Sequence, residues 1–428
     1  MTDLTGTTTP TPDAAARACG CPEFSLSRRR FLAGVTASTG ALAGTQLFGD
    51  AFRQVAYGAN PDGNVVVVLS FRGGADGVSI VVPTGADDQT RLQALRPDIR
   101  IRTSDVATGG NGFGLHPGLA PLVDMWGQGK FGAVHAVGMG EPNRSHFDSM
   151  ELVEKANPGS SERRGWINRV AGLDAAARPE EQIQLGDSMV PTSLQGPTAA
   201  LGAYNVNALT LPDLWPDVDL AGGIRKAWGG GNTMLHRGVR TALGAVDRLA
   251  DLAATDLDPL TSAYPAGPLQ DVLANTEALI KADVGAKMVT IDYGDWDMHV
   301  GLGQPGSGWM FDHLQHFASS MATFFSRLGT WADKVTVVTI SEFGRRLEQN
   351  GDAGVDHGYG NVMLLLGGGV QGGQVHVGSG GWPTLAADAL VDGDLAVTHD
   401  YRSVFWEVLR SSCPAASVPA SCRACSRA

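Results

Sequence analysis

The stretch Val335-Thr336-Val337-Val338-Thr339-Ile340 is followed directly by Ser341-Glu342-Phe343-Gly344-Arg345, and together they decide the fold. A β-branched, apolar run of this length is typical of a strand that is buried on both faces in a parallel sheet. Earlier in the chain, residues 288–291 form a second such run. Sheets of this kind place their ligand crevice at the carboxyl ends of the strands. We therefore predict that the polar residues after both runs meet at one edge of a sheet.

Carboxylate and imidazole side chains gather after these two runs and after a predicted first strand, residues 65–71. The predicted metal ligands all lie beyond the end of a predicted strand: Asp76, Asp295, Asp297, His299, Glu342, Asp356 and His357. Such ligands suit zinc, manganese, calcium or magnesium. Several carboxylates could also bridge two ions about 3.5–4 Å apart, which would clamp the attacking and leaving oxygens of phosphoryl or sulfuryl transfer. The sequence therefore predicts a divalent-metal site with one or two ions.

A candidate nucleophile, Ser145, lies between an arginine and a histidine after a further predicted strand, residues 131–137. In this interpretation Ser145 attacks the substrate, and Arg144 or Arg345 steadies the anionic oxygens. More often, a serine in such a position caps the helix that follows it, here residues 148–156. Both roles stay open for Ser145 at this point.

Two more residue groups allow a structural interpretation beside the functional one. Asp76 follows a glycine pair, so it is either a metal ligand or a turn former and helix cap. His313 and His316 share one face of a predicted helix, residues 309–332, which also carries an aromatic stripe. These histidines therefore either bind metal or pack against the core.

Composition narrows the class of protein and of partner. The chain has 428 residues, of which 43% are hydrophobic and 18% are charged, as in globular proteins. Its formal net charge of −12 argues against a nucleic-acid partner, because no basic surface would offset phosphate repulsion. A small anionic ester substrate would have to be met by a local positive centre, such as metal ions or Arg345.

Residues 1–59 are predicted to form a twin-arginine export signal and leader. The motif Ser27-Arg28-Arg29-Arg30-Phe31-Leu32 precedes a weakly apolar run, residues 33–48. This run is too short and too polar for a stable membrane span. We expect the twin-arginine translocase to deliver the protein to the periplasm, the cell envelope or the exterior, with cleavage at residues 41–43 or nearer Ala59.

Residues 60–412 are predicted to form one α/β domain, a three-layer sandwich around a mostly parallel sheet. Amphipathic patterns predict helices over residues 233–252 and 269–282. Residues 157–232, rich in proline and glycine, are expected to form a loop-rich cap over the active face. A tail, residues 413–428, carries three cysteines, which allow at most one internal disulfide: Cys413, Cys422 and Cys425.

Six motifs follow one another along the chain: Arg72-Gly73-Gly74-Ala75-Asp76-Gly77, Leu115-His116-Pro117, Arg144-Ser145-His146-Phe147, Trp296-Asp297-Met298-His299, Ser341-Glu342-Phe343-Gly344-Arg345 and Asp356-His357-Gly358. In this order they resemble the domain-of-unknown-function 1501 (DUF1501) family. The resemblance covers residues 60–412, and that family is similar to the alkaline phosphatase and sulfatase superfamily. It implies a two-metal hydrolytic site on a mostly parallel sheet.

By this likeness Asp76 would be the first metal ligand and His357 a late histidine ligand. His299, with Asp297 or Asp295, would supply the middle pair. Two departures stand out. Ser341-Glu342-Phe343 replaces the superfamily's Asp-His-Gly, and Gly294-Asp295-Trp296-Asp297 is one acidic residue longer than the family's Gly-Trp-Asp.

Three functions are compatible with these observations. The first is an exported metal-dependent hydrolase of phosphate or sulfate esters. The second is a cell-envelope binding or assembly protein that keeps the fold and one metal without turnover. In the third, an unrelated α/β fold uses the same carboxylates as caps and salt bridges.

Overall fold

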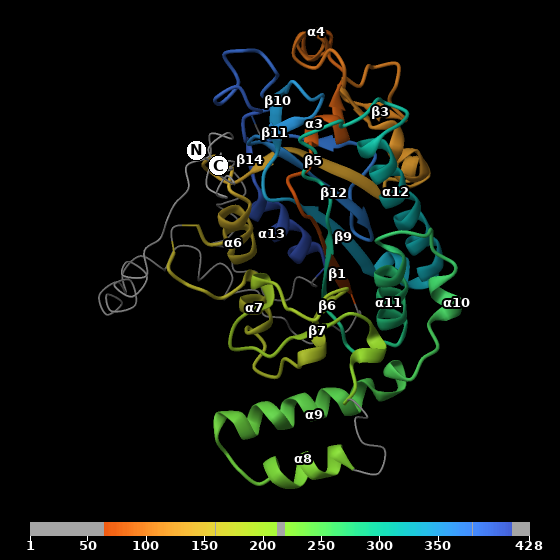
Figure 1. Ribbon diagram of the computed structural model, residues 1–428, viewed down its shortest axis with the longest axis vertical. Helices are drawn as coiled ribbons and strands as arrows, with labels where there is room; N and C mark the ends of the chain where they lie inside the picture. Colours follow the sequence, from red (N-terminus) through yellow and green to blue (C-terminus); the bar gives the residue numbers. More distant parts are fainter. Residues whose placement is uncertain (1–63, 159, 212–218, 379, 413–428) are drawn as a thin grey trace, which may run out of the picture. The chain divides into compact units, whose positions relative to one another are not determined.

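The computed structural model describes residues 64–158, 160–211, 219–378 and 380–412 (Figure 1). All of them belong to one compact unit, Asp50–Ala428. The predicted export signal and the cysteine tail lie outside the described residues. Among the described residues, no helix combines the length and the apolar character that crossing a membrane requires.

The protein is built on a nine-stranded sheet with the strand order β13-β5-β12-β9-β1-β8-β6-β7, in which β14 pairs with β5 (Figure 1). The strands are β1 (Val65–Phe71), β5 (Phe131–Gly138), β6 (Gln182–Leu185), β7 (Leu201–Ala203), β8 (Met288–Tyr293), β9 (Val335–Ile340), β12 (Asn361–Gly367), β13 (Val375–His376) and β14 (His399–Asp400). All pairings are parallel except the two that β12 makes with β5 and β9. The predicted mostly parallel sheet is therefore confirmed.

Helices cover both faces of this sheet. The α-helices are α3 (Gly77–Ile80), α4 (Ala86–Leu95), α5 (Val123–Gly127), α6 (His146–Lys155), α7 (Trp166–Ala171), α8 (Leu220–Trp228), α9 (Met234–Ala253), α10 (Asp258–Thr261), α11 (Gln270–Lys281), α12 (Trp309–Leu328) and α13 (Tyr401–Ser412). Short 3₁₀ helices are η3 (Pro117–Leu122), η4 (Pro179–Glu181), η5 (Thr192–Leu194), η6 (Val206–Ala208) and η7 (Gly329–Lys334). The predicted helices thus lie close to their expected positions.

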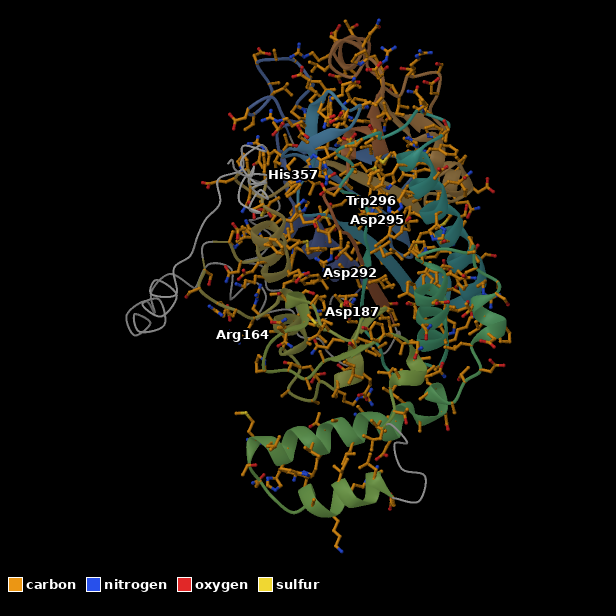
Figure 2. All side chains as sticks on the ribbon, viewed as in Figure 1. Arg164, Asp187, Asp292, Asp295, Trp296 and His357 are labelled. Carbon is orange, nitrogen blue, oxygen red and sulfur yellow. The ribbon has the colours of Figure 1, made fainter. Side chains whose placement is uncertain are left out.

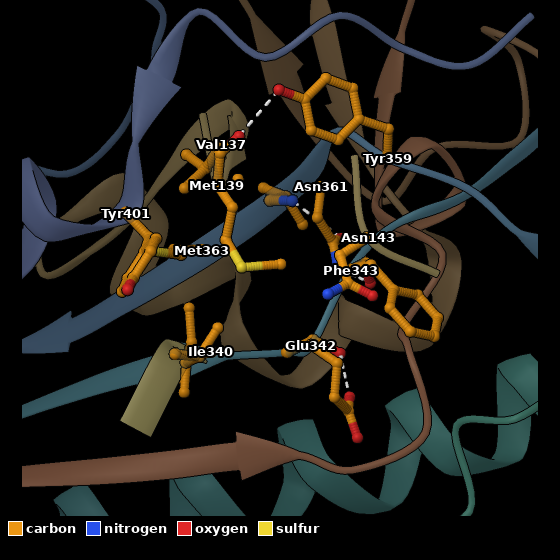
Figure 3. A pocket seen from close by; sticks show the side chains of 14 residues that line it. Val137, Met139, Asn143, Ile340, Glu342, Phe343, Tyr359, Asn361, Met363 and Tyr401 are labelled. Atoms are coloured by element: carbon orange, nitrogen blue, oxygen red, sulfur yellow. Dashed lines mark hydrogen bonds between the residues drawn. The ribbon is translucent and has the colours of Figure 1, made fainter. Parts of the chain in front are cut away.

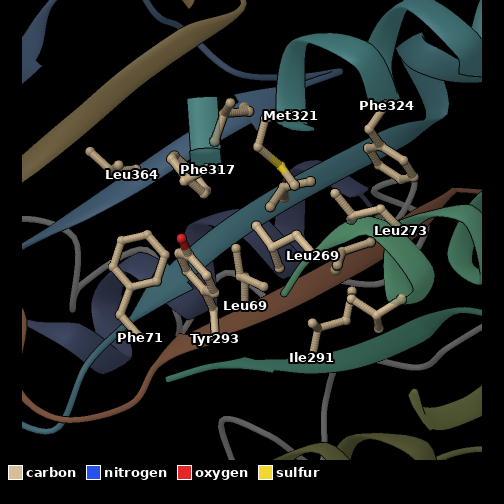
Figure 4. Close-up of a cluster of buried hydrophobic side chains, with 14 of the residues drawn as sticks. Leu69, Phe71, Leu269, Leu273, Ile291, Tyr293, Phe317, Met321, Phe324 and Leu364 are labelled. Atoms are coloured by element: carbon tan, nitrogen blue, oxygen red, sulfur yellow. The ribbon is translucent and has the colours of Figure 1, made fainter. Parts of the chain in front are cut away.

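Alternate residues of β1 enter two separate hydrophobic clusters, which shows that both faces of the sheet are buried. Val67 and Leu69 pack with α11 and α12, as Figure 4 shows for Leu69, Leu273 and Phe317. Val66 packs on the opposite face with α6, α7 and α13. Fully burying each such side chain contributes about 1.5–3 kcal/mol. Because both faces need cover, the β-branched runs produce the three-layer sandwich that the sequence predicts.

Two segments differ from the sequence-based expectation. Residues 84–114, for which no helix or strand is predicted above, contain α4 and two strands, β3 (Gly109–Gly110) and β4 (Phe113–Leu115). With β2 (Val81–Pro83), these strands form a separate three-stranded sheet. Within residues 157–232, β6 and β7 belong to the central sheet beyond β8, and α8 pairs with α9, the helix that follows this segment (Figure 1).

The segment after β9 brings distant residues to the carboxyl edge of the sheet. A two-stranded hairpin there, β10 (Arg345–Gln349) with β11 (Val355–His357), pairs Arg345 directly with His357. Glycine is required at Gly344, because a Cβ there would lie 1.9 Å from the carbonyl oxygen of Gly360. The close approach of these two backbones holds the hairpin against the start of β12.

His135 in β5 is fully buried and electrically neutral. Its Nε2–H donates to the carbonyl oxygen of Val81 at 2.8 Å, and its Nδ1 accepts from the N–H of Ala136 at 2.8 Å. A second proton would leave Nδ1 facing an N–H donor. Burial lowers the pKa of His135 to about 4, although the hydrogen bond to Val81 opposes the shift.

We predict that His135 makes the protein acid-sensitive. Below its unfolded pKa of 6.5 the unfolded chain takes up a proton that the folded chain refuses, so stability is lost as the pH falls from 6.5 toward about 4. The loss per group is about 1.36 kcal/mol for each pH unit in this window. The drop in melting temperature between about pH 7 and about pH 5 should therefore be smaller in His135→Gln than in wild type. Equal drops would contradict a neutral, buried His135.

Candidate metal centre

Three side chains from distant parts of the chain converge at the carboxyl edge of the sheet. His146 opens α6, Asp297 lies in the loop after β8, and His357 ends β11. One ligand atom from each lies within 4.8 Å of the other two. His146 Nε2 is 3.0 Å from His357 Nε2 and 3.7 Å from Asp297 Oδ2, and His357 Nε2 is 3.3 Å from Asp297 Oδ1.

His299 is a fourth candidate ligand beside these three. Its Nε2 is 2.9 Å from His357 Nε2 and 3.0 Å from Asp297 Oδ1. The same nitrogen also lies 3.3 Å from Arg345 Nη1. A guanidinium and a cation would therefore compete for the lone pair of His299, whereas His146 and His357 have no such competitor among the contacts of the described residues.

The outer hydrogen bonds decide which ring nitrogens can bind a cation. His357 Nδ1 is 2.9 Å from the carbonyl oxygen of Arg144. A carbonyl oxygen can only accept, so Nδ1 carries the proton and Nε2 presents a lone pair. His299 Nδ1 similarly lies 2.8 Å from Asp356 Oδ1. Metal-binding histidines have this arrangement, in which the second ring nitrogen donates to a carbonyl or a carboxylate.

The geometry and the donor types fit a divalent cation. Lone pairs of two imidazole Nε2 atoms only 2.9 Å apart repel each other unless a proton or a metal lies between them. In a tetrahedral zinc site with bonds of about 2.0–2.2 Å, neighbouring ligand atoms lie about 3.3–3.6 Å apart. The separations between the candidate ligand atoms run from 2.9 Å to 3.7 Å and therefore span this range. Imidazole and carboxylate donors together also suit zinc.

The electrostatics keep His357 and Asp297 in their metal-binding protonation states. Burial lowers the pKa of His357, and the positive charge of Arg345 lowers it further. Burial raises the pKa of Asp297, but the hydrogen bond and charge of Arg345 outweigh it and hold the pKa below its usual value. A neutral imidazole and an ionised carboxylate are therefore both present near neutral pH.

The Glu342 carboxylate lies between the turn after β1 and the outer nitrogen of His146. Its carboxylate accepts hydrogen bonds from the backbone N–H groups of Gly73 and Gly74, each at 2.9 Å, and Oε1 lies 3.8 Å from His146 Nδ1. Burial raises the pKa of Glu342, but the nearby His146 ring and the hydrogen bonds from these N–H groups outweigh it and lower the pKa. Glu342 therefore faces the outer nitrogen of His146, as Asp356 faces that of His299.

Gly73 and Gly74 make this support possible. Both have positive φ angles, 116° and 75°. A Cβ on Gly73 would lie 2.6 Å from the backbone nitrogen of Asp297. The turn after β1 can therefore pass between Glu342 and the Asp297 loop only with glycine at this position.

The buried side chain of Arg345 connects several segments around the candidate centre. Its guanidinium donates to the carbonyl oxygens of Gly73, Gly74 and Val355, and it binds Asp297 Oδ1 at 2.5 Å. It was expected to steady the anionic oxygens of a substrate. Because these acceptors already engage its N–H groups, Arg345 contributes its positive charge to the centre rather than a hydrogen bond to a substrate.

Several residues predicted from sequence lie elsewhere. Asp76 was expected among the ligands and is instead buried against Arg96, with 2.5 Å between Arg96 Nη1 and Asp76 Oδ2. Asp295 is exposed, with a left-handed φ of 64°, and Figure 2 shows it beside Trp296 and away from His357. Tertiary pairing thus excludes Asp76, and backbone direction turns Asp295 to solvent.

The predicted catalytic residues have structural contacts of their own. The hydroxyl oxygen of Ser145 accepts from the N–H of Asp148 at 3.5 Å, so Ser145 is the N-cap of α6. The guanidinium of Arg144 pairs with Asp394. His313 Nε2 lies 2.8 Å from the carbonyl oxygen of Gly294, which favours packing over metal binding.

His146 was not predicted as a ligand. In the sequence it was weighed as a neighbour of Ser145, and its own role depends on α6 beginning at that residue. The available signal was the position of Arg144-Ser145-His146-Phe147 after a strand, since a histidine there reaches the same sheet edge as the other ligands.

A small pocket lies behind Glu342. Figure 3 shows Met139, Ile340 and Met363 on its apolar side, with Asn143 and Glu342 at its polar side. None of the four candidate ligands lines it. The candidate centre is therefore separate from this pocket, with Glu342 between them.

Comparisons with known proteins agree with part of this description. The model of the DUF1501 family, described as a protein of unknown function, matches residues 263–400. This range includes Asp297, His299, Glu342 and His357, and it begins after His146. The resemblance to that family is thus confirmed over this part of the chain. No curated protein matches the chain.

Two solved structures are similar to the chain at low sequence identity. One is the C-terminal periplasmic domain of EcEptC from Escherichia coli in complex with zinc, with 10% identity, 72% of this chain and 74% of that chain covered, and a TM-score of 0.31. The other is a magnesium-bound mutant of alkaline phosphatase from the Antarctic bacterium TAB5, with 9% identity, coverages of 82% and 98%, and a TM-score of 0.34.

We predict that His146→Ala lowers zinc affinity about 100-fold or more, because outer-sphere changes alone cost about 10–100-fold. The matched control is His376→Ala, which removes a histidine from β13. Among the described residues, the hydrogen-bond partner of its Nε2 is the carbonyl oxygen of Gln371. Chelator competition on the purified full chain measures both. Equal affinity of the two variants would contradict the assignment of His146.

Proposed function

We propose that this chain is a metal-dependent hydrolase of phosphate or sulfate esters. The observation that carries the proposal is the convergence of imidazole Nε2 atoms and a carboxylate on one point at the carboxyl edge of a mostly parallel sheet. Hydrolysis of such esters requires a positive centre that binds an anionic oxygen and stabilises the charge that develops on it. A cation at this point would be that centre on a chain whose net charge is −12.

His146, Asp297 and His357 would hold the cation, with His299 as a fourth ligand, and zinc is the metal that we favour. The donor set has more imidazole than carboxylate, and this distinguishes it from the oxygen-rich sites that calcium and magnesium prefer. When bound, the cation would polarise the ester's anionic oxygens and lower the pKa of a hydroxyl or water beside it. We propose one ion, because the Arg345 guanidinium, 2.5 Å from Asp297 Oδ1, already supplies a second positive charge beside this carboxylate.

Ser145 is the nucleophile that we propose. It is exposed and precedes the candidate ligand His146 directly. As the N-cap of α6 it accepts a hydrogen bond, and it keeps its own O–H proton for transfer. The N-cap also fixes the Ser145 backbone at the start of α6, one residue before His146.

A non-catalytic binding protein is the second candidate function. Arg345 favours it, because its contacts with Asp297 and His299 stabilise the centre without any cation. In this case the protein would bind an anionic group or one metal in the cell envelope and would not turn over an ester.

We also propose that the protein is exported by the twin-arginine route, from the motif at Ser27 to Leu32. Replacing Arg28 and Arg29 by lysine should keep the protein in the cytoplasm, because the translocase reads this arginine pair. Cell fractionation of both forms tests this. Export of the lysine variant at the wild-type level would contradict it.

We predict that the zinc-loaded protein hydrolyses aryl phosphate or aryl sulfate esters, and that Ser145→Ala lowers kcat about 1,000-fold or more while zinc affinity is kept, since it removes the nucleophile. The control is Thr233→Ala, which removes the N-cap of α9 away from the predicted site residues. Both variants lose a helix cap, worth about 0.5–2 kcal/mol.

The outcomes separate the candidates. Turnover that survives in Ser145→Ala would overturn the nucleophile assignment. Zinc binding without turnover of any ester in wild type would overturn the hydrolase and favour the binding protein.

A further inference from the structure

Two arginines converge on the buried carboxylate of Asp394. Among the described residues, Asp394 makes no direct contact with a candidate metal ligand. Arg144 Nη2 pairs with Asp394 Oδ2, and Arg346 Nη1 lies 3.7 Å from Asp394 Oδ1. Asp394 is fully buried. Each arginine adjoins a segment that supplies the candidate metal centre.

The first link runs through Arg144. Its backbone carbonyl oxygen accepts the hydrogen bond from His357 Nδ1 at 2.9 Å, which fixes the tautomer of that ligand. Two residues later the chain reaches His146, the first residue of α6. Anchoring Arg144 therefore places one ligand directly and sets the outer hydrogen bond of another.

The second link runs through Arg346. It follows Arg345 in β10, whose guanidinium contacts Asp297 Oδ1 at 2.5 Å and His299 Nε2 at 3.3 Å. Anchoring Arg346 therefore restrains the strand that carries Arg345. One carboxylate thus restrains the supports of all four candidate ligands.

The backbone that carries Asp394 is fixed by a tight turn. The N–H of Asp394 donates to the carbonyl oxygen of Val391 at 2.9 Å, and Val391 returns the bond at 3.0 Å. Asp392 and Gly393 between them have left-handed φ angles of 52° and 82°. This is the backbone of a tight two-residue turn, so the carboxylate has a fixed position.

Stability alone does not explain this ion pair. Asp394 Oδ1 and Arg144 Nε are both buried without a hydrogen-bond partner. A buried pair with unsatisfied polar atoms is often no more stable than an apolar replacement, because desolvation offsets the attraction. The arrangement instead serves placement of the backbone around it.

We propose that Asp394 is a positioning residue for the metal centre, which acts through Arg144 and Arg346. This inference rests on the proposed metal function. Removing its charge releases Arg144, loosens the carbonyl that orients His357 and lets the start of α6 shift. The expected consequence is weaker metal binding with little change in the metal-free fold.

The test compares Asp394→Asn with Asp392→Asn in the full chain. Asp392 is exposed and only 4.0 Å from Arg144 Nη2, so its replacement changes the same net charge beside the same arginine. Asp394→Asn should lower zinc affinity about 10–100-fold in chelator competition, as loss of outer support does at other metal sites. Asp392→Asn should bind as wild type does.

A cobalt-loaded sample gives a readout that a merely structural role would not move. The visible absorption of bound cobalt should change in Asp394→Asn and return in Asp394→Glu, because the bands report ligand geometry. If Asp394→Asn does not fold, Arg144→Gln takes its place, since it keeps the carbonyl that binds His357 and should give the same loss of affinity.

The outcomes are distinguishable. Wild type without zinc or cobalt binding would overturn the proposed function itself. Wild-type binding together with equal affinity and spectra in Asp394→Asn, or in Arg144→Gln where that variant replaces it, would overturn this inference alone. A fall in affinity shared equally by Asp392→Asn would also overturn it, because a general charge effect would then suffice.

Discussion

The hydrogen bond from His357 Nδ1 to the carbonyl oxygen of Arg144 is the interaction on which the account of the site depends. A carbonyl accepts and never donates, so this bond fixes one tautomer of His357 and turns its Nε2 lone pair inward. His299 is oriented in the same sense by Asp356. Two inward lone pairs at 2.9 Å need a positive charge between them. A pair of ordinary surface histidines would not be held in this way.

The fold supplies the convergence from segments that are distant in sequence. β1, β8 and β9 lie side by side and run parallel, so the turns that follow them share one edge. Glycine at residues 73 and 74 lets the first turn pass close to the other two. Glu342 lies between these turns and accepts hydrogen bonds from the backbone N–H groups of Gly73 and Gly74. Glu342 therefore has a structural role: it ties the turn after β1 to the segment after β9, and its Oε1 faces His146 Nδ1 at 3.8 Å.

Much of the fold could be predicted from sequence, because β-branched runs such as residues 335–340 have few alternatives to a buried strand. The short strand β6 contains two glutamines and was not predicted, and α4 is too polar to show a helical periodicity. The convergence of Asp297, His299 and His357 could be predicted from their place after strands. The exclusion of Asp76 could not, because its partner Arg96 approaches only in the folded chain. The role of His146 depends on where α6 begins, and helix starts are the least certain feature of a sequence.

We propose that His146, Asp297 and His357 hold one divalent cation. Anomalous X-ray scattering at the zinc absorption edge, from crystals of the full chain grown with zinc, locates such an ion. We expect one strong anomalous peak about 2.0–2.2 Å from His146 Nε2, His357 Nε2 and an oxygen of Asp297. A peak bound by other residues, or no peak with the Arg345 contacts intact, would contradict it.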